Sequence, residues 1–584
     1  MSMLTATSLL IAAVGLQPAP PETGIPQPPN GGDVFITSVP APPPADILEV
    51  IPANASFVAA VRDLAGFDTN VAGLLERLDI QASPYTILKS WLQIVTGLDD
   101  RGSAALVFLP NRSPSAAHPD MVLLLPMVDR AAMLAFLDPM PLGDGDTRVT
   151  LRGRETYVAV KDRHAVFGPD ARVVRSLAES RQSIGGRWSA QEVERYRAND
   201  WSLWLDPTRM SCGFGDTAGF SGSLIALADS ALRELRFNAI GLSGRADASG
   251  ITLELLMQRG SAPPELPQTE VAKPLLAGLP VGPVVLAVGA AGNGEREPFL
   301  TGMRALLSYL TGSGICTAGG VDRFVEAAAS AHELVQSAAL SVSRDSAGEP
   351  GPFTLAMVIR VRGEGAVLVN RIERVVDAVK GGLVSDPAYH AALQRVQFRR
   401  AAETVKDVSV DYLTADLSGY GGTEAAAFRE SFGVDQFLVR VGVVAPSHVV
   451  ITFGGGSERF ENVVEAVRAE QAPLASTLGI VSPSEGTAPA RWLEGYLAVD
   501  RFIGLVRSLR VDAERPPAVL DAPESTAPIT VVAYGAGPST SRFDVHLPVA
   551  ALAEIRAAWT DPTTPARPML SRSGGGDAES RSSP

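Results

Sequence analysis

The stretch HVVITFGGGSERFENVVEAV, residues 448–467, decides how the fold is interpreted. It consists of an apolar run, three glycines, and then apolar residues that recur every three or four positions. The run predicts a strand, and the three-to-four spacing predicts an amphipathic helix. A strand, a glycine-rich turn and a helix in this order also build many phosphate-binding loops. The stretch therefore raises the choice between a nucleotide site and a structural turn.

The residues around the glycines favour the structural turn. A Walker loop ends in Gly-Lys-Ser/Thr, whereas Gly456 is followed by Ser457 and Glu458, and a carboxylate there repels phosphates. The dinucleotide fingerprint has a third glycine where this chain has Arg459, and that glycine permits close packing of helix on strand. We interpret the run as a turn, with anion binding at the helix N-terminus as the alternative.

The stretch HAVFGPDARVVRSLAES, residues 164–180, repeats the strand, turn and helix without the glycine run. Three further pairs of segments recur in the same order, and a weaker fifth pair reads as two β-hairpins. These four other pairs are 50–67 with 278–294, 119–140 with 352–376, 200–210 with 491–504, and 236–257 with 529–549. Their common order predicts an internal duplication.

The predicted fold class is α+β, with two related modules. Hairpins require antiparallel pairing, so each module is expected to be a mostly antiparallel sheet with helices packed on one face. The matched histidines, His164 and His448, lie further apart than the matched prolines, Pro52 and Pro280. The second module is therefore expected to carry an insertion near 381–440, a region that reads as helical and loop-like.

Apolar periodicity predicts the helices of both modules. The predicted ranges are 71–78 extending through 91, 131–136, 171–179, 222–233, 298–310, 322–338, 366–379, 460–470 and 549–559.

The bulk composition indicates folded material and argues against a nucleic-acid partner. The chain has 584 residues, of which 46% are hydrophobic and 20% charged, with a net charge of −14. That length predicts more than one domain. Because binding to a phosphate backbone needs a basic surface, we expect no nucleic-acid partner.

The N-terminus resembles an export signal. The expected segments are a signal peptide at 1–16, a Pro-rich spacer at 17–45, the first module at 46–262, the second module at 263–560, and a disordered tail at 561–584. The signal is atypical because the first basic residue is Arg62, and a misplaced start codon is one explanation. We expect a periplasmic or extracellular protein with no integral membrane segment after signal removal.

The two cysteines, Cys212 and Cys316, are a candidate disulfide. Export would permit one bridge, and closing a loop of this length stabilises a chain by up to roughly 4–5 kcal/mol in the chain-entropy model. Two free buried thiols are the equal alternative.

The motifs that could carry chemistry are incomplete. HELVQ has Gln336 where a zinc protease has its second histidine, so we expect no metal site. The G-x-S-x-G pattern of one hydrolase class is missing. His164 and His448 occupy matched places and read as polar residues at strand starts. Asp206 and Asp500 end matched predicted strands and are the best carboxylate pair, although turn capping is the commoner use.

The aromatic residues Trp201, Trp204 and Tyr496 lie on these same matched strands. They could line a pocket for a lipid or glycan, but core packing is the commoner use. No cofactor is expected, and catalytic residues are unknown.

Three phrases carry a family resemblance: ADILEVIPANASFVAAVRDL, VLLLPMVDRAAMLAFL and HAVFGPDARVVRSLAES. In pattern the chain resembles uncharacterised exported bacterial proteins that carry a duplicated domain of unknown function. The resemblance implies an envelope location and no established activity, and it transfers no functional residue.

The sequence thus predicts an exported, non-enzymatic binding or envelope scaffold protein, with an unknown protein or envelope ligand as its partner. One alternative is a hydrolase whose site is assembled from distant residues. Another is a carrier of an apolar ligand between sheet and helices.

Overall fold

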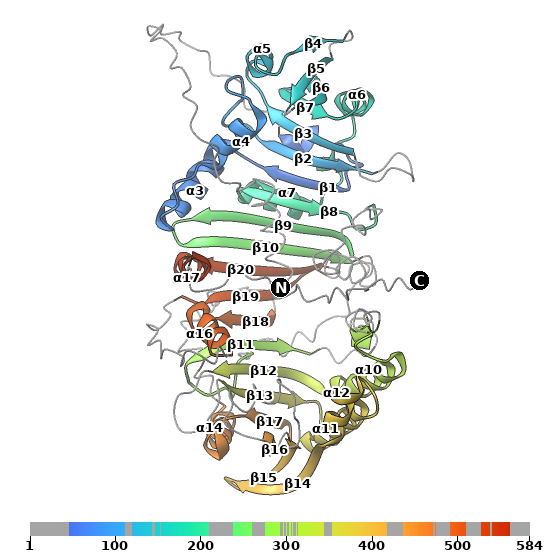
Figure 1. Ribbon diagram of the computed structural model, residues 1–584, viewed down its shortest axis with the longest axis vertical. Coiled ribbons are helices and arrows are strands. Elements are labelled where there is room, and N and C mark those ends of the chain that lie inside the picture. Colours follow the sequence, from blue (N-terminus) through green and yellow to red (C-terminus); the bar gives the residue numbers. More distant parts are fainter. Residues whose placement is uncertain are drawn as a thin grey trace, which may run out of the picture.

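Twenty strands among the described residues form one antiparallel sheet along the longest axis of the molecule (Figure 1). The structure is a computed structural model. It describes residues 46–110, 120–142, 146–151, 153–209, 237–259, 275–292, 314–343, 353–416, 436–470, 491–509, 527–537 and 540–560, with residues 296, 299, 300, 303, 304, 307, 311 and 474.

The first ten strands make up the first half of the sheet. They are β1 (Phe57–Val61), β2 (Ala104–Leu109), β3 (Asp120–Pro126), β4 (Met140–Pro141), β5 (Thr147–Leu151), β6 (Arg154–Lys161), β7 (His164–Gly168), β8 (Trp201–Leu205), β9 (Phe237–Asp247) and β10 (Gly250–Arg259).

The other ten strands make up the second half. They are β11 (Val284–Ala291), β12 (Val335–Ser343), β13 (Thr354–Val361), β14 (Val396–Val405), β15 (Val408–Asp416), β16 (Gln436–Ala445), β17 (His448–Phe453), β18 (Arg491–Leu497), β19 (Ile529–Gly537) and β20 (Thr540–Pro548).

The helices lie between these strands in the chain. They are α2 (Ile47–Val50), α3 (Leu64–Arg77), α4 (Pro84–Leu92), α5 (Arg130–Leu134), α6 (Ala171–Glu179), the 3₁₀ turn η1 (Ile184–Gly186), α7 (Ala190–Ala198), α10 (Ala318–His332), α11 (Gly365–Lys380), α12 (Pro387–Gln394), α14 (Gly456–Arg468), α16 (Val499–Leu509) and α17 (Val549–Thr560). Among the described residues, none of the helices is long and apolar enough to cross a membrane.

The two halves of the sheet have the same strand order when each is followed inward from its outer edge. The first half runs β4-β5-β6-β7-β3-β2-β1-β8-β9-β10. The second half runs β14-β15-β16-β17-β13-β12-β11-β18-β19-β20. Every neighbouring pair is antiparallel, so the antiparallel part of the predicted fold class is confirmed.

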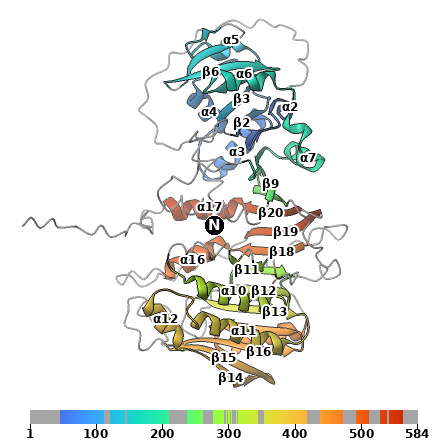
Figure 2. The ribbon, with the colours of Figure 1, turned by 90° about the vertical axis from the view of Figure 1, so that its right-hand side faces the viewer.

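The halves meet where β10 pairs with β20. The register runs from Gly250 opposite Pro548 to Gln258 opposite Thr540, with Glu254 opposite Asp544 at its centre. Figure 1 shows β10 and β20 side by side in the middle of the molecule, and Figure 2 shows, after a turn of 90°, β9 on one side of β20 and β19 on the other. Each half also has its own hydrophobic clusters, and none of the clusters among the described residues contains residues of both halves.

The prediction that helices pack on one face of each sheet is wrong. In the second half, Val358 and Val450 pack with residues of α14, whereas Ile359 and Val449 pack with residues of α11. Successive residues of a strand point to opposite faces, so α14 and α11 cover opposite faces of the sheet. The first half behaves alike, because Val166 packs with α6 and its neighbours in β7 pack with α5.

Most predicted helices match the structure, and two differ, one for a local reason and one because of strand pairing. The range 171–179 is α6 itself, and α5, α11, α14 and α17 overlap their predicted ranges. The helix predicted across 71–91 is broken because Asp79 has a φ of 51° and Pro84 starts a new helix. The helix predicted to reach 338 ends at His332, since Val335 already pairs with β13. The range 222–233 and most of 298–310 lie outside the described residues.

The region near 381–440 contains a long hairpin. The described part has the short helix α12 and then the strands β14 and β15, so the helical and loop-like prediction is wrong for 396–416. In the strand order, this hairpin takes the place that the shorter β4 and β5 have in the first half. Arg399 and Arg400 interrupt the apolar alternation of β14, and a register irregularity follows Arg399. Because of these two arginines, the sequence of β14 lacks the regular apolar alternation by which a strand is predicted.

Candidate polar site at the start of helix α14

The backbone requires the three glycines that follow β17, of which the third is the first residue of α14. Gly454, Gly455 and Gly456 have φ values of +69°, +67° and +60°, in the left-handed region. Only glycine adopts this conformation routinely, and each other residue would cost roughly 1–2 kcal/mol. A Cβ at Gly455 would also lie 2.9 Å from Cβ of Arg459. The geometry of the turn thus accounts for the glycine run without a nucleotide.

Helix α14 begins without a side-chain cap. Its N-cap residue is Gly455, which has no side chain to accept a hydrogen bond. At the matched place in the first half, Asp170 caps α6 by accepting a hydrogen bond of 2.6 Å from the Arg172 N–H. Because the first N–H groups of a helix lack intrahelical partners, the start of α14 keeps backbone donors available for other acceptors.

A carboxylate from β14 lies on one side of this helix start. Glu403 accepts hydrogen bonds from the Tyr412 hydroxyl at 2.8 Å and from Arg440 Nε at 3.1 Å, and it also accepts from the Ser457 hydroxyl in the first turn of α14. Negative charge near a helix N-terminus is favourable. Burial alone would raise the pKa of Glu403, but these three donors outweigh it and hold the pKa below its usual value.

A row of small hydroxyl residues lies on the other side. Arg459, which is 6% exposed, donates to the Ser343 hydroxyl at 3.2 Å. Ser343 is the register partner of Thr354, whose methyl lies 3.3 Å from where a Cβ of Gly455 would be. Ser341 and Thr452 both lie opposite Ala356, which packs in the α14 core. They therefore face the same side of the sheet.

Three of these hydroxyls have no hydrogen-bond partner among the described residues. They belong to Ser341, Thr354 and Thr452, which are 0%, 5% and 0% exposed. A buried polar group without a partner costs about 1–3 kcal/mol, so native structures rarely leave one unpaired. Sequence reasoning missed this cluster, although small polar residues at alternate positions of apolar strands were a usable signal.

Replacing Glu403 with glutamine is expected to remove an acid-sensitive part of the stability. Because the folded-state pKa of Glu403 is lowered, its contribution is complete above the usual glutamate pKa of about 4.3 and is lost as the pH falls through the lower folded-state value. Urea unfolding at several pH values between about 6 and 3 measures this. Unfolding free energies that fall equally steeply in E403Q and the natural chain would contradict it.

Asp206 and Asp500 belong to separate clusters. Asp206 directly follows β8, is 1% exposed, and forms ion pairs with Arg187 and Arg209. The expectation that Asp500 ends a strand is wrong, because β18 ends at Leu497 and Asp500 lies in the first turn of α16. The neighbour of Asp500 is Glu554 of α17, whose pKa is raised by burial and by the Asp500 charge.

The histidines are not brought together as a metal site. His164 is fully buried with Nε2 3.1 Å from the Ser103 carbonyl oxygen, and burial lowers its pKa. Nδ1 of His448 lies 3.2 Å from the Ser447 hydroxyl. His332 ends α10 while Gln336 lies on β12, so HELVQ is not one helical turn. The described residues contain no group of three or more metal-binding side chains.

The other candidate residues from the sequence are the aromatic residues and the two cysteines. Trp204 and Tyr496 are each 4% exposed and belong to the main cores of the first and second half, which confirms core packing for them. Trp201 packs over Gly244. Cys316 is buried, but Cys212 lies outside the described residues, so the disulfide stays a prediction.

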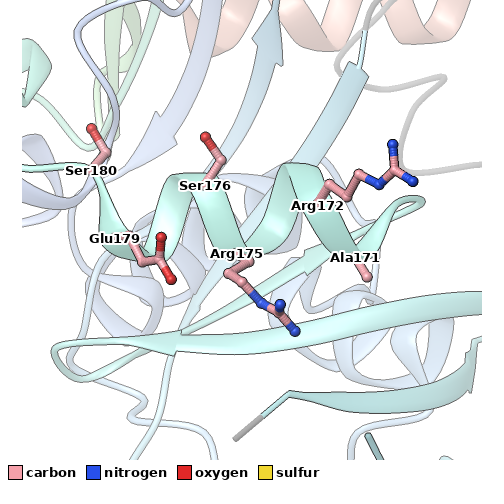
Figure 3. Close-up of a pocket in the computed structure, with 6 residues that line it drawn as sticks. All are labelled: Ala171, Arg172, Arg175, Ser176, Glu179 and Ser180. Atoms are coloured by element: carbon pink, nitrogen blue, oxygen red, sulfur yellow. The ribbon is translucent and has the colours of Figure 1, made fainter. Parts of the chain in front are cut away.

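An open hollow of about 500 Å³ lies along the exposed side of α6 (Figure 3). Its lining residues are Ala171, Arg172, Arg175, Ser176, Glu179 and Ser180. Arg175 forms an ion pair of 2.6 Å with Asp146, and Arg172 is exposed, unlike the buried Arg459 at the matched place of α14. Every lining residue comes from one helix or its end, so the hollow does not gather groups from different elements.

Comparisons with known proteins give no family. No protein-family model matches the chain, and no curated protein matches it. Among solved structures, crystal form I of TP0453 is 12% identical with a TM-score of 0.24, and the match covers 38% of this chain and 82% of that one. Crystal form III is also 12% identical with a TM-score of 0.24, covering 39% and 84%. At these TM-scores we transfer neither fold nor function.

Proposed function

We propose that this chain is an exported, non-enzymatic binding or scaffold protein, built from two related modules and located in the periplasm or outside the cell. It belongs, on this proposal, with exported bacterial proteins that carry a duplicated domain of unknown function. The partner is a protein or another envelope component.

The matching strand order of the two halves is the observation that carries the proposal. Each strand of the first half and its counterpart in the second differ by ten in strand number, and the β10–β20 register is symmetric about Glu254 and Asp544. The first residue of β10, Gly250, is paired with Asp247, and the first residue of β20, Thr540, is paired with Gly537, so both pairs have the same separation in the chain. This order supports duplication more strongly than the sequence pairs do, because it involves all twenty strands.

The outer end of the first half supports a binding role. Exposed apolar side chains lie around α5 in the first half, at Val95, Val128, Phe136 and Met140. The segments of Val95 and Val128 are held together, since Val128 donates its N–H to the Gly97 carbonyl. Contiguous exposed apolar residues are typical of interaction sites. The paired state of Asp206 and Glu403 also favours structural roles for these carboxylates over catalytic ones.

Export predicts a shortened mature chain. We expect intact-mass measurement of the protein recovered from its natural host to show loss of about the first 15 or 16 residues, because residues 9–16 are an apolar run with a small-x-small triplet. The cell-free product of the same gene is the control, and it should keep the full mass. Recovery of the natural protein with its first 15 residues intact would contradict cleavage.

The binding role can be tested at the apolar end. A photo-crosslinking residue at Phe136 is expected to capture one partner reproducibly in the host, and a second substitution, V128S, should weaken that capture. The matched control places the same group at Asn462, an exposed position of α14. The same crosslinked products from Phe136 and from Asn462 would contradict a binding site at this end. Turnover of ester or peptide substrates that is lost in D206N would contradict a non-enzymatic role.

A further inference from the structure

We infer that the start of helix α14 is a binding site for a small oxyanion such as phosphate or sulfate, held between the glycine turn and the hydroxyls of Ser341, Thr354 and Thr452. The inference deepens the proposed binding role by naming the chemical class of one ligand. The biological use of the site rests on the proposed binding role, whereas the existence of the site is argued from geometry alone.

The first argument is the supply of backbone donors. Helix α14 has no side-chain cap; two left-handed glycines precede it, and a third, Gly456, is its first residue. Successive backbone N–H groups in such turns form concavities that bind anions, and the helix dipole adds to the attraction. The capped start of α6 lacks this arrangement because Asp170 already supplies the negative oxygen.

The second argument is independent of the helix start and concerns the sheet beneath it. The buried hydroxyls of Ser341, Thr354 and Thr452 lack partners among the described residues, and all three belong to the sheet face that α14 covers. Thr354 lies beside the glycine turn, since its methyl is 3.3 Å from where a Cβ of Gly454 or Gly455 would be. Hydroxyl groups can each donate one hydrogen bond to an anionic oxygen, which would remove the cost of leaving them unpaired.

The charges nearby are compatible with an anion. Glu403 bonds to the first turn through Ser457, and its carboxylate is already paired with Arg440 and accepts a hydrogen bond from Tyr412. Glu403 lies towards β14 and β15, on the opposite side of β17 from Ser343 and Thr354. Glu458 lies in the first turn itself, but it is exposed, whereas the three hydroxyls are buried. Arg459, bonded to Ser343, adds positive charge to the side where the hydroxyls lie.

The test measures inorganic phosphate binding to the full chain by calorimetry and by thermal unfolding. We expect saturable binding, a rise in Tm with phosphate concentration, and a similar response to sulfate. The variant T452V should weaken phosphate binding about tenfold, since one hydrogen bond to a charged group is worth about 1.5–3 kcal/mol. The control T404V removes an exposed hydroxyl of β14 and should bind phosphate normally.

Valine is close to threonine in shape, so T452V should fold, and without phosphate its Tm should equal or exceed that of the natural chain. If T452V still fails to fold, S341A provides the same test. Absence of saturable phosphate and sulfate binding, or unchanged binding in both variants, would overturn the inference. Crosslinking at Phe136 does not involve this site, so either result can fail without the other.

Discussion

Replacing Phe460 with alanine is expected to lower the free energy of unfolding by about 3–5 kcal/mol. The Phe460 side chain is fully buried in the core formed by α14 and the sheet, beside Val463, Val464 and Val467. Its ring fills the space above Gly442, where an added Cβ would lie 2.6 Å from Cζ of the ring. Losing this ring removes apolar burial and leaves a cavity that the surrounding strands cannot close. Urea unfolding followed by circular dichroism measures the change.

The matched control is Asn462→Ala, an exposed position on the same helix. Surface substitutions of this kind usually change stability by less than about 0.5 kcal/mol. A loss below about 1 kcal/mol for F460A would mean that α14 does not pack on the sheet as described.

The sequence was sufficient to predict α14 and its core face, because local periodicity alone determines both. Phe460, Val463, Val464 and Val467 follow the spacing of one helical face, and all four are buried. The hairpin of β9 and β10 was predictable for the same reason, since its alternation and turn are local. Such features need no knowledge of what packs against them.

Features set by distant partners could not be predicted. Val335 and Ala338 continue the apolar spacing of α10, yet they pair with Val361 and Ile359 of β13 and form a strand. Strand β14 is an edge strand whose only described neighbour is β15, so its outer residues are polar and hide the alternation. In both cases the pairing with a neighbouring strand determined the secondary structure, although the local sequence pattern favoured another one.

In the candidate site, too, the local feature could be predicted from the sequence and the feature set by distant partners could not. The glycine turn was visible in the sequence, but the hydroxyls of Ser341, Thr354 and Thr452 come from three separate strands. They form one cluster only because the registers of β12, β13 and β17 align them. The Asp500 prediction failed because β18 ends at Leu497, directly after its last aromatic residue, and the chain forms α16 from Val499.

Replacing Asp206 with alanine is expected to destabilise the first half by about 3 kcal/mol, at the lower end of the range for breaking a buried ion pair. The Asp206 carboxylate is 1% exposed and binds Arg187 and Arg209, whose side chains are 31% and 38% exposed. It also accepts the Thr208 N–H at 3.0 Å. Because both arginines keep part of their hydration, losing the carboxylate costs less than it would between fully buried partners.

Two further variants show which role Asp206 has. D206N keeps an oxygen for the Thr208 N–H and should lose less stability than D206A, and the exposed Glu179→Ala should lose almost none. Residues kept for catalysis often cost a protein stability, so their replacement tends to leave stability unchanged or raise it. A D206A chain as stable as the natural one in urea would therefore favour a hydrolase over the proposed scaffold, whereas a loss of about 3 kcal/mol identifies Asp206 as the ion-pair partner that fixes the end of β8.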